Sequence, residues 1–160
     1  MNKLKILYPV FTVILITGSF FLGTAFGARD TAEMIRSLVV SWDETRVHTA
    51  DWGEMRFFYR GETFGTKDVL TAAAVVRAGE SVHPAHRHAE EEYLILAKGS
   101  GTWHLNGKEF PAREGDVLYV EPWHMHGLIN TSDEPLTFYV VRWTSKGVTP
   151  PPEPEGSHGR

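Results

Sequence analysis

The stretch HPAHRHAEEEYLILAKG, residues 83–99, places histidines and glutamates directly before an apolar run. Successive side chains of a β-strand point to opposite faces, so an extended segment would put His86, His88, Glu92 and the two leucines of YLIL on one face. Two imidazoles and a carboxylate would then converge on one point, while the leucines continue that face as core. Such ligands suit Fe(II), Mn(II), Ni(II), Co(II) or Zn(II). The stretch therefore predicts a strand that begins at a metal site.

A second segment, GDVLYVEPWHMHGLIN at residues 115–130, has the pattern of a strand, a turn with proline and a returning strand. The two segments together resemble the paired motifs of the cupin superfamily. The first family motif, H-x-H followed by Glu and then Gly, falls on His86, His88, Glu92 and Gly99. The second motif falls on five positions, namely Gly115, Asp116, Pro122, His126 and Asn130.

The resemblance covers about residues 69–143 and implies an all-β fold, a double-stranded β-helix or jelly-roll barrel. It also implies one divalent metal ion inside the barrel, of the kinds named above, held by four residues, His86, His88, Glu92 and His126. The sequence departs from the family at Trp123, where glycine is frequent and permits a positive φ that tryptophan resists. The turn geometry there is left open, and the Trp123 side chain is a candidate for the pocket mouth.

Other acidic residues and histidines near the motifs are weaker candidates. Glu91 lies one residue before Glu92, and this odd offset would turn its side chain to the opposite face of the strand. Glu90 shares the parity of Glu92, and we expect it to be a solvated carboxylate at the rim. His83 and His124 each lie beside a ligand histidine in a turn with proline, which favours a solvent-facing or supporting role. The alternative to a metal site is that the barrel binds no metal and that these residues are the remnant of a lost site.

The chain from Met55 onward has the pattern of short strands separated by turn residues. The predicted strands are 55–59, 69–76, 92–97, 101–105, 116–120 and 136–143. Regularly spaced short strands with turn signals between them are typical of an all-β sandwich or barrel. The pair Asn106-Gly107 predicts a hairpin, and Asn130 predicts a turn fixed by side-chain hydrogen bonds.

The start of the chain has the pattern of an export signal. Two lysines precede an uncharged apolar run over residues 6–26, which ends among small residues. This pattern predicts a signal peptide over residues 1–27, cleaved after Gly27, and a periplasmic or secreted protein. The run approaches the roughly 20 apolar residues that span a bilayer, so a membrane anchor over residues 6–27 is the alternative. The chain has no cysteine, which excludes a lipoprotein anchor on this segment.

Three segments complete the predicted organisation as one domain with extensions. Residues 28–68 are an N-terminal extension with leading strands and a short helix over Asp30–Val40. Residues 69–147 form the cupin-like domain. Residues 148–160 are rich in proline and glycine with little apolar surface, which predicts a disordered tail.

Charge excludes one class of partner. The formal net charge is −4, and it becomes −6 without residues 1–27, because these carry Lys3 and Lys5 and no acidic residue. An acidic chain of this kind gives no electrostatic footprint for nucleic acid. We expect instead a small-molecule ligand or substrate, and a homodimer in which Trp52–Tyr59 adds to the sheet of a partner.

The family resemblance leaves the reaction open, because it implies dioxygenases, oxalate-processing enzymes, isomerases and lyases alike. The first hypothesis is a metal-dependent enzyme, dioxygenase-like or related, acting on a small polar or carboxylate-bearing molecule. No catalytic residue is assigned, although Glu90 or His124 is a candidate proton carrier. The alternative is a non-catalytic module that binds a sugar or a small carboxylic acid.

Overall fold

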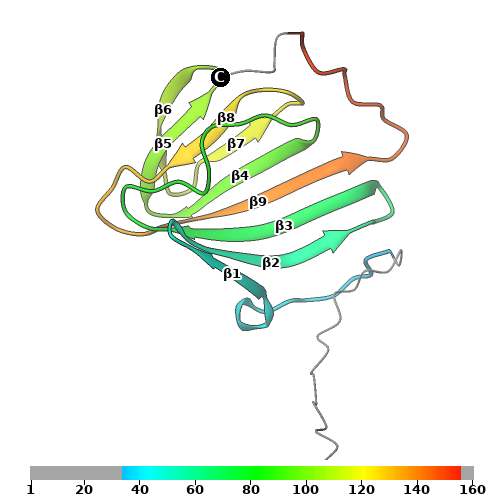
Figure 1. The fold of residues 1–160 in the computed structure, drawn as a ribbon. Helices are drawn as coiled ribbons and strands as arrows, with labels where there is room; N and C mark the ends of the chain where they lie inside the picture. The colour runs from blue at the N-terminus through cyan, green and yellow to red at the C-terminus, as the bar shows by residue number, and fades with distance from the viewer. Residues whose placement is uncertain (1–33, 156–160) are drawn as a thin grey trace, which may run out of the picture. The chain divides into compact units, whose positions relative to one another are not determined.

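The computed structural model describes residues 34–155, which form two antiparallel β-sheets (Figure 1). The larger sheet has six strands, in the spatial order β1 (Arg46–Ala50), β2 (Gly53–Gly61), β3 (Thr66–Val76), β9 (Leu136–Ser145), β4 (Glu91–Lys98) and β7 (Val117–Val120). The smaller sheet has three, in the order β6 (Lys108–Arg113), β5 (Ser100–Leu105) and β8 (His126–Ile129). A short 3₁₀ helix, Trp42–Glu44, precedes β1. The predicted all-β jelly-roll architecture is confirmed.

Strand β4 shows why these residues form a sheet with one buried face. Glu92, Leu94 and Leu96 are buried, whereas Tyr93 and Ile95 between them are exposed. This alternation has the period of two that a half-buried strand requires. The strand therefore turns its leucines into the core and carries Glu92 on the same inner face.

The core lies between the inner faces of the two sheets. Strands β3, β4 and β9 contribute most of it, and β5, β6 and β8 close it from the other side. Its buried side chains are Ala72, Ala74, Val76, Leu94, Leu96, Trp103, Ala112, Leu128, Leu136, Phe138 and Val140. Asn130 is buried at the end of this core, and its side-chain amide donates to the carbonyls of Val76 (3.0 Å) and Glu134 (2.8 Å). The prediction that Asn130 fixes a turn is confirmed.

The segment before the barrel differs from the sequence expectation. Residues 34–40 are not helical, so the helix predicted over Asp30–Val40 is wrong in this part, and residues 30–33 lie outside the described residues. The segment runs along β2 instead, because the Ile35 amide donates to the Glu62 carbonyl (2.7 Å) and the Tyr59 hydroxyl donates to the Leu38 carbonyl (3.0 Å). These contacts with β2 and with Glu62, the residue after it, replace the hydrogen bonds of a helix.

The leading strands also correct the predicted dimer contact. Strand β1 lies in the segment 28–68, where leading strands were expected, and it pairs with β2, which pairs with β3 on its other side. Residues 53–57 of the stretch Trp52–Tyr59 therefore have no free edge to add to a partner's sheet, since they pair with β1 on one side and with β3 on the other. The predicted contact, in which this stretch adds to a partner's sheet, is therefore wrong. The homodimer itself stays a prediction.

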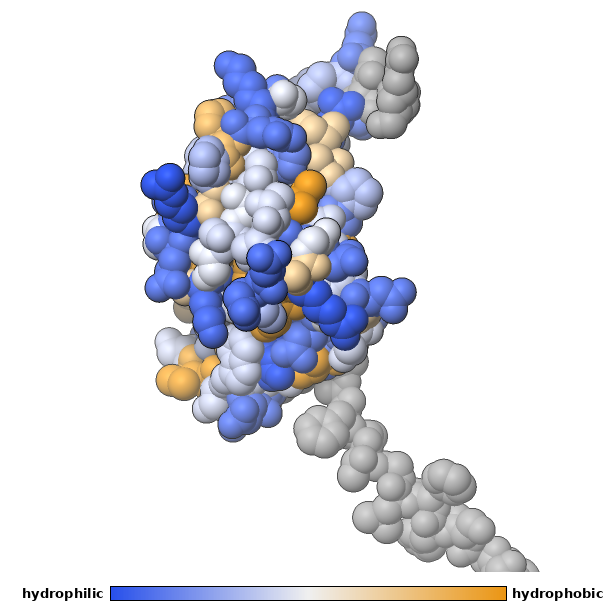
Figure 2. Space-filling model, turned by 90° about the vertical axis from the view of Figure 1, so that its left-hand side faces the viewer, coloured by the Kyte–Doolittle hydropathy of each residue, from blue (hydrophilic) through white to orange (hydrophobic). Residues whose placement is uncertain are grey.

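The surface of the described residues is mainly polar on the face in Figure 2, with hydrophobic residues lying among the hydrophilic ones. Such a distribution is ordinary for a surface in water. Within residues 34–155, no helix is long and apolar enough to cross a membrane. The predicted signal peptide, or the anchor over residues 6–27, lies outside the described residues.

Candidate metal centre

The loop before β4 and the loop that ends at His126, the first residue of β8, meet and bring the histidines together. His86 and His126 form an isolated antiparallel bridge, in which each amide donates to the other residue's carbonyl (2.9 and 2.8 Å). The Trp123 amide donates to the His88 carbonyl (2.7 Å), which ties the same two loops together again. The backbone thus holds residues that are about 40 positions apart side by side.

Three of the predicted residues form one compact cluster, and the fourth contacts it. Ring nitrogens of His86, His88 and His126 lie within 4.8 Å of one another. The two carboxylate oxygens of Glu92 lie 3.1 Å from His88 Nε2 and 3.5 Å from His126 Nε2. His126 and Glu92 are buried, with 1% and 5% of their surface exposed. The structure therefore brings all four residues together, and their role as ligands stays a prediction.

The second ring nitrogen fixes the orientation of two imidazoles. His126 Nδ1 lies 2.9 Å from the His124 carbonyl, and His88 Nδ1 lies 3.0 Å from the Glu90 carbonyl. A carbonyl oxygen only accepts, so Nδ1 must be the protonated nitrogen in each ring. Nε2 of each ring then faces the cluster and a carboxylate oxygen of Glu92, which is the orientation that supporting hydrogen bonds give to metal-bound histidines.

Unpartnered nitrogens show that the cluster fits a metal ion. Within the described residues, His126 Nε2 and His86 Nδ1 are buried and have no hydrogen-bond partner. A buried polar group without a partner costs about 1–3 kcal/mol, so native proteins rarely leave two of them in one place. A divalent cation would satisfy such lone pairs, and three imidazoles with one carboxylate match the preferences of Mn, Fe, Ni, Co and Zn.

The electrostatics hold these groups in the protonation states that bind metal. Burial raises the pKa of Glu92, but the contacts with His126 and His88 outweigh it and lower that pKa from 4.5 to about 2. Burial, and then the neighbouring imidazoles of His83, His126 and His88, lower the pKa of His86 from 6.5 to about 4. Near neutral pH the carboxylate is therefore ionised and the His86 ring is neutral, as coordination requires.

A cavity of about 160 Å³ opens beside the cluster. His86, Glu92 and His126 are among its polar residues, and apolar side chains from five strands form most of the remainder. These are Met55, Leu70, Leu94, Leu128, Phe138 and Val140. The volume is below the roughly 300–1,000 Å³ of pockets for drug-sized ligands, so the cavity suits a small molecule.

The other candidates near the motifs lie around the cluster in different ways. His83 contacts His86 edge-on, with ring centroids 4.0 Å apart, and lines the cavity. The His124 side chain is 42% exposed and lies 3.4 Å from Glu121, outside the cluster. A Glu90 carboxylate oxygen lies 3.4 Å from His88 Nδ1, and Glu91 accepts a hydrogen bond from the Tyr119 hydroxyl (2.7 Å). Glu91 does not join the cluster, as the parity of β4 predicts.

Trp123 keeps the turn that glycine would make. Its φ is +67°, a left-handed value that costs an ordinary residue about 1–2 kcal/mol. Its indole Nε1 donates to the Pro151 carbonyl (2.7 Å), and the side chain does not line the cavity, so its predicted place at the pocket mouth is wrong. This contact also holds part of the predicted disordered tail against the domain.

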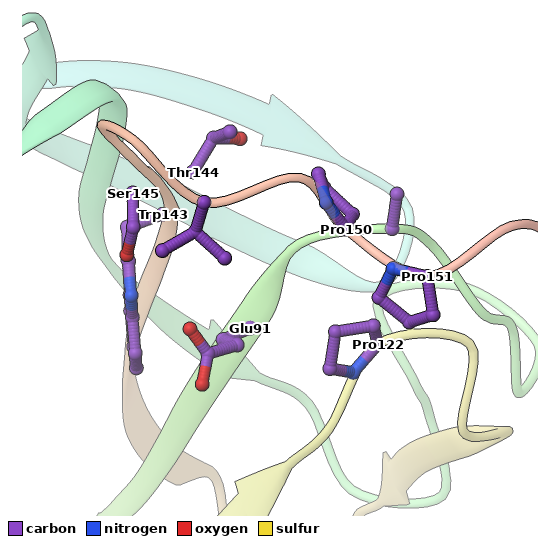
Figure 3. Close-up of a pocket in the computed structure, with 9 residues that line it drawn as sticks. Glu91, Pro122, Trp143, Thr144, Ser145, Pro150 and Pro151 are labelled. Carbon is purple, nitrogen blue, oxygen red and sulfur yellow. The ribbon is translucent and has the colours of Figure 1, made fainter.

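A second pocket, of about 200 Å³, lies where this tail meets the barrel. Figure 3 shows Pro150 and Pro151 facing Pro122, with the Glu91 carboxylate beside Trp143. Glu91 is on the opposite face of β4 from Glu92, so this pocket is separate from the histidine cluster. None of the predicted ligands lines it.

One cavity residue was not singled out from the sequence. Arg142 lines the cavity from β9, two residues after Val140 and four after Phe138 on the same inner face. The signal was present, since alternate residues of LTFYVVRW are apolar up to the point where an arginine takes the next inward position. The alternation of side chains along this strand would have placed Arg142 on the inner face, next to the core.

Comparison with known proteins agrees with this architecture. A family model described as "Cupin domain" matches residues 73–142. A cupin 2 conserved barrel domain protein from Salinispora arenicola has a similar crystal structure, with a TM-score of 0.52 and 26% identity. The similarity covers 71% of this chain and 90% of that chain.

Two curated relatives match at the sequence level. An oxalate-binding protein from Thermotoga maritima is 31% identical over 88 residues, which cover 55% of this chain and 73% of that protein. A gentisate 1,2-dioxygenase from Streptomyces sp is 30% identical over 81 residues, or 50% of this chain, and the match spans only 22% of that enzyme. The two motifs, the two-sheet barrel and these matches together show that the chain belongs to the cupin superfamily.

Proposed function

We propose that this chain is an exported, metal-dependent cupin enzyme, dioxygenase-like or related, that acts on a small polar or carboxylate-bearing molecule. The observation that carries the proposal is the buried, unpartnered Nε2 of His126, which faces Glu92 at the wall of a small cavity. Buried polar atoms in native proteins nearly always have a partner, so an unpartnered nitrogen that faces a carboxylate supports a bound cation. The names of the dioxygenase and oxalate-binding relatives support the same substrate class.

In this proposal, different residues of the chain bind the metal ion and line the substrate cavity. His86, His88, Glu92 and His126 hold the ion, and four protein ligands leave open positions on a metal that takes about six. A divalent metal there supplies Lewis acidity and a template for the substrate and a co-reactant. The apolar part of the cavity, with Phe138 among its walls, excludes water from the reacting molecule.

A non-catalytic binding module is the second candidate. The relative named as an oxalate-binding protein favours it, because its name describes binding and the match covers 73% of that protein. In this case the metal site and cavity would hold a small acid without turning it over.

Metal reconstitution followed by turnover assays separates the two candidates. We expect the metal-free chain to bind about one Mn, Fe, Ni, Co or Zn ion, measured by mass spectrometry. The Fe- or Mn-loaded protein should then consume O₂ or release CO₂ with members of a panel of small hydroxy and keto acids. Binding of panel members without turnover in any metal form would favour the binding module. Failure to bind any of the five metals would contradict both.

Export rests on the sequence of residues 1–27 alone. N-terminal sequencing of protein recovered from a host's periplasm or medium should begin at Ala28. A full-length protein that stays in the membrane fraction would instead indicate the anchor over residues 6–27.

A further inference from the structure

A single cationic side chain, Arg142, interrupts the apolar inner face of β9. Leu136, Phe138 and Val140 precede it at intervals of two residues, and all three are buried. Arg142 follows in the same register and lines the cavity beside the histidine cluster. Arg142 itself is half-buried, and a charged group in such apolar surroundings is more stable when it has a partner of opposite charge.

The strand register places Arg142 next to the metal cluster. Its Cα partner on β4 is Glu92, and its Cα partner on β3 is Leu70. Directly opposite residues of neighbouring antiparallel strands have Cβ atoms about 4.5–5.5 Å apart. The arginine side chain therefore starts beside the Glu92 carboxylate and extends along the wall of the same cavity.

Arg142 nevertheless forms no ion pair with any of residues 34–155. The structure gives it no hydrogen bond and no ion pair there, and Glu92 directs both carboxylate oxygens to His88 and His126.

The chemistry of the cavity indicates which kind of ligand would pair with Arg142. A guanidinium presents several N–H donors in a planar fork that matches the two oxygens of a carboxylate. The walls around it are apolar, with Leu70, Leu94 and Val140 among them, and the volume of about 160 Å³ admits only a small molecule. A small organic acid meets both conditions, because its carboxylate pairs with the arginine while its remaining atoms fill the apolar space or reach the metal.

We propose that Arg142 anchors the carboxylate of a small organic acid in the cavity beside His86, His88, Glu92 and His126. This inference rests on the proposed function, of which it specifies the substrate class and the residue that selects it. A carboxylate paired with Arg142 orients the acid relative to the side chains of His86, His88, Glu92 and His126, so Arg142 sets which acids bind productively. Neutral molecules of the same shape lack the charge that the guanidinium recognises.

Calorimetric titration of the full, metal-loaded chain tests this anchor with two matched pairs of probes. Oxalate and oxamide have the same shape, as do benzoate and benzamide, and only the first of each pair is charged. We expect at least one acid to bind while its amide does not. Arg142→Met should weaken acid binding by about 10- to 100-fold, the range that one charge-assisted pair contributes. Arg142→Lys, which keeps the charge without the fork, should fall between the two.

Arg60→Met is the matched control, because Arg60 is an exposed arginine on β2 and should bind the acids like the wild type. Metal content is measured for every variant. Equal acid affinity in Arg142→Met and wild type, loss of metal from Arg142→Met, or binding of amides as tight as acids would each overturn the anchor. Turnover is measured separately. If the chain binds acids through Arg142 but does not turn them over, the proposed role of Arg142 holds and only the proposed enzymatic activity is contradicted.

Discussion

The individual side chains of the cluster are arranged for an ion at a cost to the metal-free protein. His126 is 1% exposed, and its Nε2 has no hydrogen-bond partner in the described part of the chain. The backbone carbonyl of His124 holds the other ring nitrogen, so the ring cannot turn to find a partner without losing that bond. A ligand that binds only the folded state therefore stabilises it.

Replacement of His126 by alanine should abolish most of the stabilisation that metal provides. At a free metal concentration 100 times Kd, binding stabilises the native state by about 2.7 kcal/mol. For a domain of this size, this corresponds to a rise in Tm of roughly 8 °C. We expect this rise for wild type and His124→Ala, and little rise for His126→Ala, in thermal unfolding with and without metal.

His124→Ala is a fair control because the His124 side chain is largely outside the cluster and only its backbone carbonyl supports His126. The increase on adding metal is compared, and not Tm itself, since alanine at position 126 also removes a buried ring. An equal loss of the increase in both variants would show that the ligand set is misassigned.

The metal-free protein should lose stability as the pH falls below about 6.5. The pKa of His86 is lowered to about 4 in the folded protein, so between pH 6.5 and 4 the unfolded chain binds a proton that the folded protein does not. The pKa of Glu92 is lowered to about 2, so its contribution is complete above pH 4.5 and is lost as the pH falls toward 2. Both effects have the same sign.

Thermal unfolding in the presence of a chelator from pH 8 to 4 measures this dependence. His86→Gln should show a shallower fall than wild type between pH 6.5 and 4, because glutamine does not titrate. Parallel curves for the two proteins would contradict the assigned burial of a neutral His86.

At the scale of elements, the close pairing of β5 with β8 holds His126 in place. Gly101 lies in β5, and a Cβ at this position would come 2.2 Å from the Ile129 carbonyl oxygen of β8. A backbone atom cannot move aside without disturbing the strand, so only glycine permits this approach. The first residue of β8 is His126, and the position of the strand therefore sets the position of a candidate ligand.

Gly101→Ala should destabilise the barrel and weaken metal binding together. We expect the free energy of unfolding to fall by about 3 kcal/mol, at the upper end of overpacking costs, because the clash is with backbone. Gly65→Ala is the control, since no atom lies within 4 Å of the added Cβ and the change should stay within about 0.5 kcal/mol. Denaturant unfolding and metal titration of both variants provide the measurement, and a tolerated Gly101→Ala would mean that β5 and β8 are not so closely paired.

On the scale of the whole molecule, the barrel extends beyond the region that carries the family motifs. The family match begins at residue 73, whereas β1 and β2 pair in front of it and extend the larger sheet. Met55 of β2 lines the cavity, and Phe57 packs against the core. Without these strands, β3 would present a long unpaired edge, which favours aggregation.

Two truncated chains test this boundary. Residues 28–147 should unfold cooperatively, with a loss of about 1 kcal/mol because the hydrogen bond from Trp123 to Pro151 is removed. Residues 69–147, the predicted domain without its leading strands, should be insoluble or lack a cooperative transition. Circular dichroism melting and size-exclusion chromatography measure both, and a cooperative melt of residues 69–147 near that of the longer chain would show that β1 and β2 are dispensable.

The sequence by itself determined the fold class and the identity of the clustered residues. Alternation along β4 placed Glu92 inward with Leu94 and Leu96, and Glu91 outward, because the period of a strand is a local property of the backbone. The two motifs likewise indicated His86, His88 and His126, which the structure brings within 4.8 Å of one another.

Only the tertiary structure decided which segments lie next to one another. It placed β2 between β1 and β3, it set Arg142 opposite Glu92, and it left residues 34–40 without helix. These outcomes depend on pairing between strands that are far apart in the chain. Pairing is selected by the total burial and hydrogen bonding of the whole barrel, and no local pattern of residues reports that sum.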